Sequence, residues 1–116
     1  MFERSEVDLL ADLIFCITKI RCYIQGVDYA AFRRDSLIQD AVIRNLEVIG
    51  EVVKHLPPEL KRQSSEIPWK MIAGTRDRLI HGYFGVNIDI VWEIATIDLP
   101  RLETELERLE KLAEKE

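Results

Sequence analysis

Apolar residues recur at every third or fourth position along most of this chain, which is the spacing of an α-helix and not of a strand. The longest runs cover residues 5–26 and 38–56, and Pro57 and Pro58 end the second of them. A last helix is predicted to begin at Pro100 and to bury a row of leucines. The pattern therefore predicts an all-α fold, an antiparallel bundle of five or six helices.

Shorter helices are predicted between these runs. One covers Tyr29–Arg33, and a second, opened by the double proline, covers 57–63. Pro68 is expected to begin a helix that ends at a left-handed cap on Gly82, since glycine favours that conformation. A further helix is predicted over 89–98.

The length of 116 residues predicts one domain over 1–116, because each half alone is too small to bury a sufficient core. Hydrophobic residues make up 47% of the chain and charged residues 32%, which is typical of a folded protein. The longest apolar stretch, Leu13–Ile17, is far shorter than a membrane helix requires. We therefore expect a cytoplasmic protein.

The cysteines and histidines do not form a metal-binding pattern. Cys16 and Cys22 lie six positions apart on one predicted helix, where they are too far apart for a disulfide, so both are expected to be reduced residues in or near the core. His55 and His81 are separated, and neither HExxH nor CxxC occurs. The sequence predicts neither a metal site nor a cofactor.

The net charge of −5 is unevenly distributed along the chain. Residues 1–53 carry 6 basic and 9 acidic groups, residues 54–88 carry 6 and 3, and residues 89–116 carry 4 and 9. Nucleic-acid binding usually needs a basic surface, so the acidic total argues against an extended, non-specific RNA-binding face. The basic middle third leaves room for a small local RNA groove.

That middle third contains a cluster of groups suited to phosphate chemistry. Asp77 and His81 are four positions apart, so on a helix Asp77 can orient the imidazole, and Arg78 lies on the same face. Arg76 can hold a phosphate through two hydrogen bonds, and Tyr83 adds a hydroxyl. On a straight helix Arg76 and His81 point about 140° apart. They converge only if the helix end unwinds, if Arg76 bends around, or if a second subunit supplies its own motif.

Three segments together resemble the HepT-like branch of the HEPN superfamily. Ile67–Tyr83 is similar to its signature, an Arg, a polar residue, a spacer and then His-x-Tyr. Gln39–Glu51 resembles the long helix of the family, and Ile90–Pro100 resembles its closing region. The resemblance covers nearly the whole chain.

The resemblance implies a HEPN-like helical fold and a dimeric, metal-independent endoribonuclease, the toxin of a toxin–antitoxin pair. In such pairs the Arg and His serve RNA cleavage, and a minimal nucleotidyltransferase silences the toxin by adenylylating the Tyr. Carried over, the catalytic residues are Arg76 and His81, and the modified residue is Tyr83. Asp77 and Arg78 are the supporting residues, and Asp77 stands where relatives often carry Asn.

A second function stays open, that of a non-catalytic dimeric helical adaptor that binds a nucleotidyltransferase or a nucleotide. The acidic total and Asp77 favour the adaptor, whereas the complete set of Arg76, His81 and Tyr83 favours the nuclease.

Other candidates are assigned simpler roles. Trp69 and Trp92 are expected to be core or dimer anchors, and Arg44 and Asn45 are secondary candidates for supporting the site. His55 is expected to pair with Glu51 across one helical turn. A run of acids near the end is expected to be a solvated face or a surface that docks a basic partner; it comprises Glu103, Glu105, Glu107, Glu110, Glu114 and Glu116.

Overall fold

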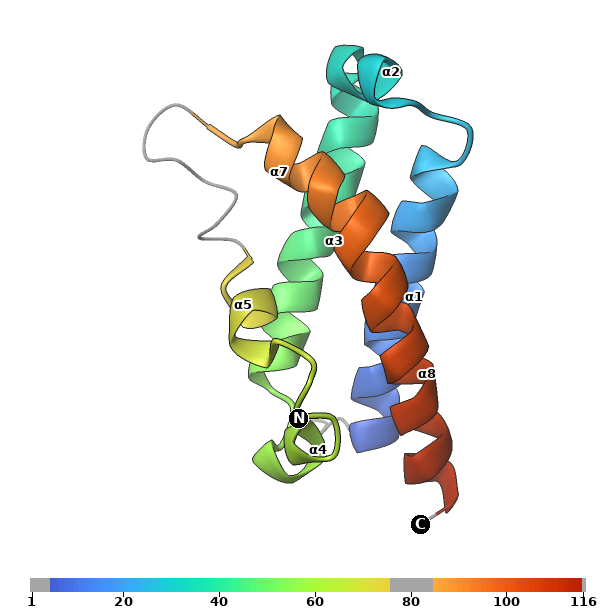
Figure 1. The fold of residues 1–116 in the computed structure, drawn as a ribbon, viewed down its shortest axis with the longest axis vertical. Coiled ribbons are helices and arrows are strands. Elements are labelled where there is room, and N and C mark those ends of the chain that lie inside the picture. Colours follow the sequence, from blue (N-terminus) through green and yellow to red (C-terminus); the bar gives the residue numbers. More distant parts are fainter. Residues whose placement is uncertain (1–4, 76–84, 116) are drawn as a thin grey trace.

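The computed structural model of this chain describes residues 5–75 and 85–115, and these residues form a bundle of helices (Figure 1). In chain order the elements are α1 (Glu6–Ile24), α2 (Tyr29–Arg34), α3 (Ser36–Lys54), α4 (Pro58–Arg62), α5 (Trp69–Ala73), α7 (Ile88–Glu93), the π-helix η2 (Ile94–Asp98) and α8 (Leu99–Lys115). The predicted all-α bundle is confirmed.

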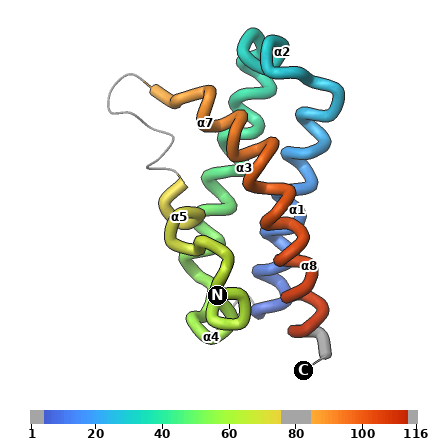
Figure 2. Tube along the Cα trace, in the orientation of Figure 1, coloured from blue at the N-terminus to red at the C-terminus, as the bar shows by residue number. Residues whose placement is uncertain are grey.

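The long helices α1, α3 and α8 form the body of the molecule (Figures 1 and 2). α1 runs antiparallel to the other two and packs against both (Figure 1). Their facing sides supply fully buried aliphatic side chains, namely Leu10, Leu13, Ile20, Val42, Leu46, Ile49, Val53, Leu106 and Leu109. None of the helices in the described residues has both the length and the apolar character needed to cross a membrane.

Side-chain caps fix where α1 and α3 start. The Ser5 hydroxyl accepts a hydrogen bond from the backbone N–H of Asp8 at 3.1 Å, as its position predicts. The Asp35 carboxylate does the same for Ile38 at 3.1 Å at the start of α3. After α1, Gly26 adopts a φ of 74°, a left-handed conformation that glycine tolerates without strain.

The sequence predicts one continuous helix from Pro68 to Gly82, but the structure interrupts this helix at Gly74. α5 ends at Ala73, and Gly74 forms a turn in which its N–H donates to the Lys70 carbonyl at 3.0 Å. Thr75 is helical again, and Gly82 lies outside the described residues. The interruption has a local cause, because glycine is the least favourable helix former after proline.

The predicted bounds of the last two helices, 89–98 and from Pro100 onwards, agree with the structure within one residue, but no gap separates them, because α7, η2 and α8 form one continuous helical path (Figure 1). A proline inside a helix lacks an N–H and its ring clashes with the carbonyl four residues earlier. The π-helical segment η2 accommodates the proline, and at its end the N–H of Leu99 donates to the carbonyl of Ile94, five residues back. Pro100 therefore lies inside the helix instead of beginning a new one.

In the acidic run, Glu107 is exposed as expected, Glu105 and Glu110 are partly buried, and Glu103 is buried. Its side chain is buried between α1 and α8, where it accepts a hydrogen bond from the Arg21 guanidinium. The sequence did not predict this burial, because Glu103 is one of many acidic residues along α8. A charged residue at the edge of an apolar stripe can be buried when a neighbouring helix offers an opposite charge.

Candidate functional site

The five residues of the predicted site, Arg76, Asp77, Arg78, His81 and Tyr83, lie outside the described residues. Their mutual geometry therefore stays a prediction. The structure does describe the chain up to Thr75 and again from Gly85, and so it shows how the body of the protein holds both flanks of this segment.

The N-terminal flank rests on α3 at Gly50. A Cβ atom on this glycine would lie 3.3 Å from the carbonyl oxygen of Ile72 and 3.4 Å from that of Ala73. These carbonyls belong to the last residues of α5, so the helix end sits directly against the backbone of α3. Only a residue without a side chain permits this approach at no cost.

Hydrogen bonds of Trp69 and Thr75 also hold the N-terminal flank in place. The Trp69 indole N–H donates to the carbonyls of Lys61 and Ser64, each at 3.1 Å, and the ring is half-buried. The Thr75 side chain is buried, and its hydroxyl donates to the Ile72 carbonyl at 2.6 Å. Trp69 thus anchors α5 to the preceding turn, as expected of a core anchor.

The C-terminal flank is fixed at the start of α7. The Asn87 side chain accepts from the backbone N–H of Ile90 at 3.1 Å and so caps this helix. Within the same helix, the Trp92 ring packs on fully buried Phe32 of α2, with ring centroids 5.0 Å apart. Trp92 is therefore a core anchor within the chain, in agreement with one of the two expected roles.

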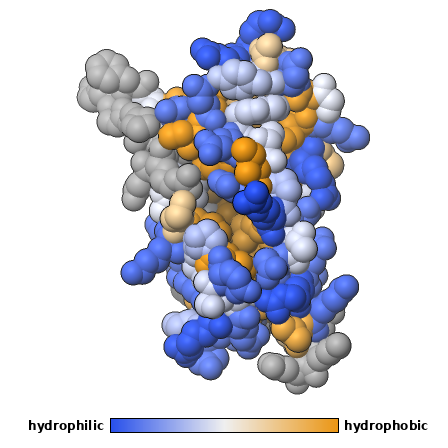
Figure 3. All heavy atoms as spheres, viewed as in Figure 1, coloured by the Kyte–Doolittle hydropathy of each residue, from blue (hydrophilic) through white to orange (hydrophobic). Residues whose placement is uncertain are grey.

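An apolar groove with a volume of about 590 Å³ opens between α5 and the path formed by η2 and α8, with α3 as its floor (Figure 3). Thr75 lines it, so it reaches the N-terminal end of the predicted site. In the part of the chain that the structure describes, its charged lining residues are Glu66, Asp98, Arg101 and Glu105, three carboxylates and one guanidinium. These carboxylates disfavour phosphate binding in the described part of the groove.

Two further candidates, Asn45 and His55, have structural roles. Asn45 is buried and donates to the carbonyl of Ala41 at 2.9 Å, one turn back in its own helix, which uses its amide locally. The predicted pair of His55 and Glu51 is confirmed at 3.7 Å on the surface. In 5–75 and 85–115, no group of three or more His, Cys, Asp or Glu residues could hold a metal ion.

Comparison with known proteins gives the same family from several directions. The model of the family described as ribonuclease HepT-like matches residues 13–109 of this chain. A candidate RNase of Caldanaerobacter subterraneus subsp. tengcongensis is 44% identical over 86 residues, which cover 74% of this chain and 77% of that protein. A candidate ribonuclease HepT of Thermococcus cleftensis is 40% identical over 109 residues, 94% of this chain and 99% of that protein. A candidate RNase of Methanocaldococcus jannaschii is 40% identical over 111 residues, 96% of each chain. No solved structure matches.

Proposed function

This chain belongs to the ribonuclease HepT-like family, and we propose on that basis that it is an endoribonuclease whose cleaving groups are Arg76 and His81. The observation that carries the proposal is that the matched residues, 13–109, contain the whole set of Arg76, His81 and Tyr83. The names of its relatives mark them as candidate ribonucleases, which supports RNA as the substrate.

The proposed reaction uses the ribose 2′-hydroxyl as nucleophile. His81 takes the proton of this hydroxyl or gives a proton to the departing 5′-oxygen, and the 2′-oxygen bonds to phosphorus as the bond to the 5′-oxygen breaks. Arg76 neutralises the charge that gathers on the phosphate oxygens. Asp77 orients His81, Arg78 adds a second cation, and these roles need no metal ion.

The deciding experiment is RNA cleavage by purified protein with and without His81. His81→Ala is expected to lose roughly 10²- to 10⁴-fold in rate, the usual contribution of a general acid or base. A matched DNA strand should stay intact, because it lacks the attacking hydroxyl, and EDTA should leave the rate unchanged. Cleavage by His81→Ala at the parental rate, in preparations free of contaminating nuclease, would rule the assignment out.

The proposal extends to regulation. We assign this chain to the toxin side of a toxin–antitoxin pair, acting as a homodimer, with Tyr83 as the group that a partner nucleotidyltransferase adenylylates. An attached AMP would place bulk and negative charge beside the RNA-cleaving groups. Incubation with that partner and ATP should add the mass of AMP to the parent and not to Tyr83→Phe, whereas Tyr23→Phe should be modified like the parent.

The second candidate, a non-catalytic adaptor, is favoured by the net charge of −5 and by the carboxylate of Asp77 within the predicted site. The two functions differ in one result. An adaptor binds the nucleotidyltransferase while the parent protein and His81→Ala both leave RNA intact, whereas a nuclease cuts RNA only with His81 present.

A further inference from the structure

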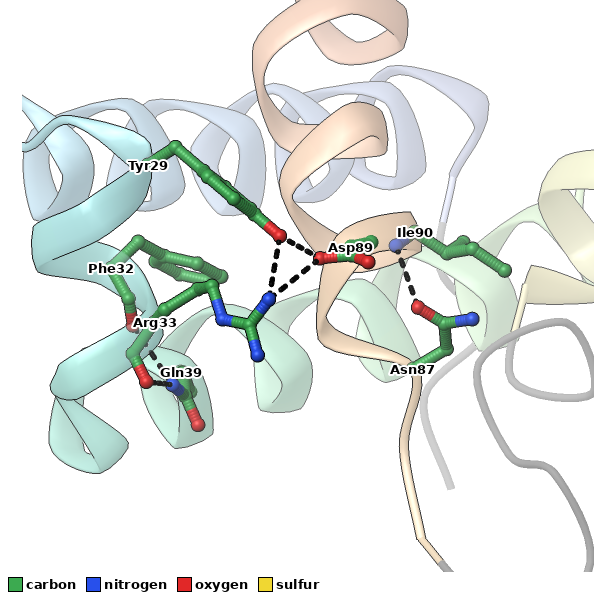
Figure 4. Close-up of polar contacts among 7 residues, drawn as sticks. All are labelled: Tyr29, Phe32, Arg33, Gln39, Asn87, Asp89 and Ile90. Atoms are coloured by element: carbon green, nitrogen blue, oxygen red, sulfur yellow. Dashed lines mark hydrogen bonds and ion pairs between the residues drawn. The ribbon is translucent and has the colours of Figure 1, made fainter.

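Three side chains join α2 to the first turn of α7 (Figure 4). The Tyr29 hydroxyl donates to the Asp89 carboxylate, and a guanidinium nitrogen of Arg33 donates to the same hydroxyl at 3.2 Å. Arg33 and Asp89 also form an ion pair at 3.9 Å. Tyr29 and Arg33 are neighbours across one turn of α2, so both reach the same carboxylate from one side. We call these three residues the α2–α7 clamp.

An aromatic cluster lies behind the clamp. The Trp92 ring packs against Phe32 and lies 6.1 Å, centroid to centroid, from the ring of Tyr29. The other end of α2 is tied to α3, because the Gln39 amide donates to the carbonyls of Phe32 and Arg33 at 2.8 and 3.0 Å (Figure 4). α2 is thus held to the long helix of the bundle, and the clamp extends this hold to α7.

The clamp adds little to overall stability. Asp89 and Arg33 are both largely exposed, with 67% and 60% of their side-chain surface accessible, and exposed ion pairs contribute little. Its position along the chain is more informative. Asp89 lies in the first turn of α7, six residues after Tyr83, so the clamp acts where the chain leaves the predicted site.

We propose that Tyr29, Arg33 and Asp89 are positioning residues for RNA cleavage. By holding the first turn of α7 against α2, they fix the C-terminal end of the segment that carries His81 and Tyr83. This inference rests on the proposed ribonuclease function. Catalysis is sensitive to such anchoring, because a displacement of about 1 Å from a remote change costs up to roughly 10²-fold in rate.

The first test removes one hydroxyl. Tyr29→Phe keeps the ring beside Trp92 and loses only the bridge to Asp89 and Arg33, so kcat for an RNA substrate should fall about tenfold, with KM changed less than about twofold. Tyr23→Phe is the matched control, because Tyr23 and Tyr29 are 36% and 37% exposed. An unchanged kcat in Tyr29→Phe overturns the proposal.

The second test separates positioning from direct RNA binding. Arg33→Asp and Asp89→Arg should each lower kcat, and the double variant, which exchanges the two charges, should recover most of the loss. If Arg33 instead contacts RNA, Arg33→Asp raises KM and the exchange rescues nothing, which overturns the proposal.

A third measurement keeps the inference distinct from the proposed function. The amides of Ile90 and Val91 bond to the Asn87 side chain and carbonyl in the first turn of α7. Their hydrogen exchange should quicken in Tyr29→Phe and not in Tyr23→Phe. If hydrogen exchange of these amides is unchanged in Tyr29→Phe, the positioning role of the clamp is overturned, even if the parent protein cuts RNA. A parent that cuts no RNA, with exchange altered as expected, overturns the ribonuclease function and the catalytic role assigned to the clamp.

Discussion

At the scale of single residues, the two cysteines differ in reactivity. Burial raises the pKa of the Cys16 thiol, although Lys19 and Arg44 oppose the effect. Cys22 is exposed, so its expected position in or near the core is wrong. A raised pKa means less thiolate at any given pH, and thiolate is the reactive form. Iodoacetamide near neutral pH should therefore modify Cys22 roughly tenfold or more faster than Cys16. Peptide mapping would measure both rates, and denaturant should make them similar.

The pair of Arg21 and Glu103 gives a stability prediction at the same scale. Glu103 keeps 11% of its side-chain surface accessible, so losing its cation leaves a carboxylate nearly out of water. Arg21→Met should lower the free energy of unfolding by about 1–3 kcal/mol. The exposed pair of Arg62 and Glu59 is the control, and Arg62→Met should change stability by less than about 1 kcal/mol. Equal effects in denaturant titrations would contradict the burial argument.

At the scale of elements, the contact between α3 and α5 connects packing to the predicted site. Gly50→Ala favours helix α3 by roughly 0.5–1 kcal/mol, but its Cβ would lie 3.3 Å from the Ile72 carbonyl and must displace α5. Because α5 leads towards Arg76, we expect RNA cleavage to fall several-fold, on the order of 3 to 10, while the thermal midpoint changes little.

Gly26→Ala is the matched control for that prediction. Gly26 has a φ of 74°, and a Cβ there would meet nothing within 4 Å. Alanine should therefore lower the thermal midpoint through backbone strain without slowing cleavage by the folded protein. If Gly50→Ala cuts RNA at the parental rate, the α3–α5 contact does not position the site.

The elements also show what the sequence could and could not predict. Helical periodicity located α1, α2 and α3 within a residue or two, because their apolar stripes and caps are local signals. It did not predict the interruption at Gly74, a local effect of glycine in a helix, or the continuity of the helical path through Pro100, where a π-helical segment accommodates the proline.

The same limit applies to the candidate site. The spacing of Arg76, His81 and Tyr83 predicts a site for RNA cleavage, but periodicity gives no sign that Tyr29 meets Asp89 across 60 positions. Gly50 offered a signal that was missed. An isolated glycine inside a strongly periodic helix lowers helix stability, and here its reason is the close packing of α5 against α3.

At the scale of the whole molecule, the charge distribution predicts how RNA affinity depends on salt. The basic middle third is flanked by two acidic regions, so only a few cations near the predicted site are expected to meet phosphates. For single-stranded RNA, log K falls with log salt by about 0.7 per phosphate neutralised. Contacts from Arg76 and Arg78 alone give a slope of about −1.4.

Binding of an RNA oligonucleotide to His81→Ala, measured at several KCl concentrations, would give this slope without cleavage. Arg78→Ala should make it shallower by about 0.7, because one phosphate contact is lost. Arg62→Ala, which alters an exposed cation paired with Glu59, should leave it unchanged. A slope of about −4 or steeper would instead indicate an extended basic surface, which the acidic outer thirds of this chain do not favour.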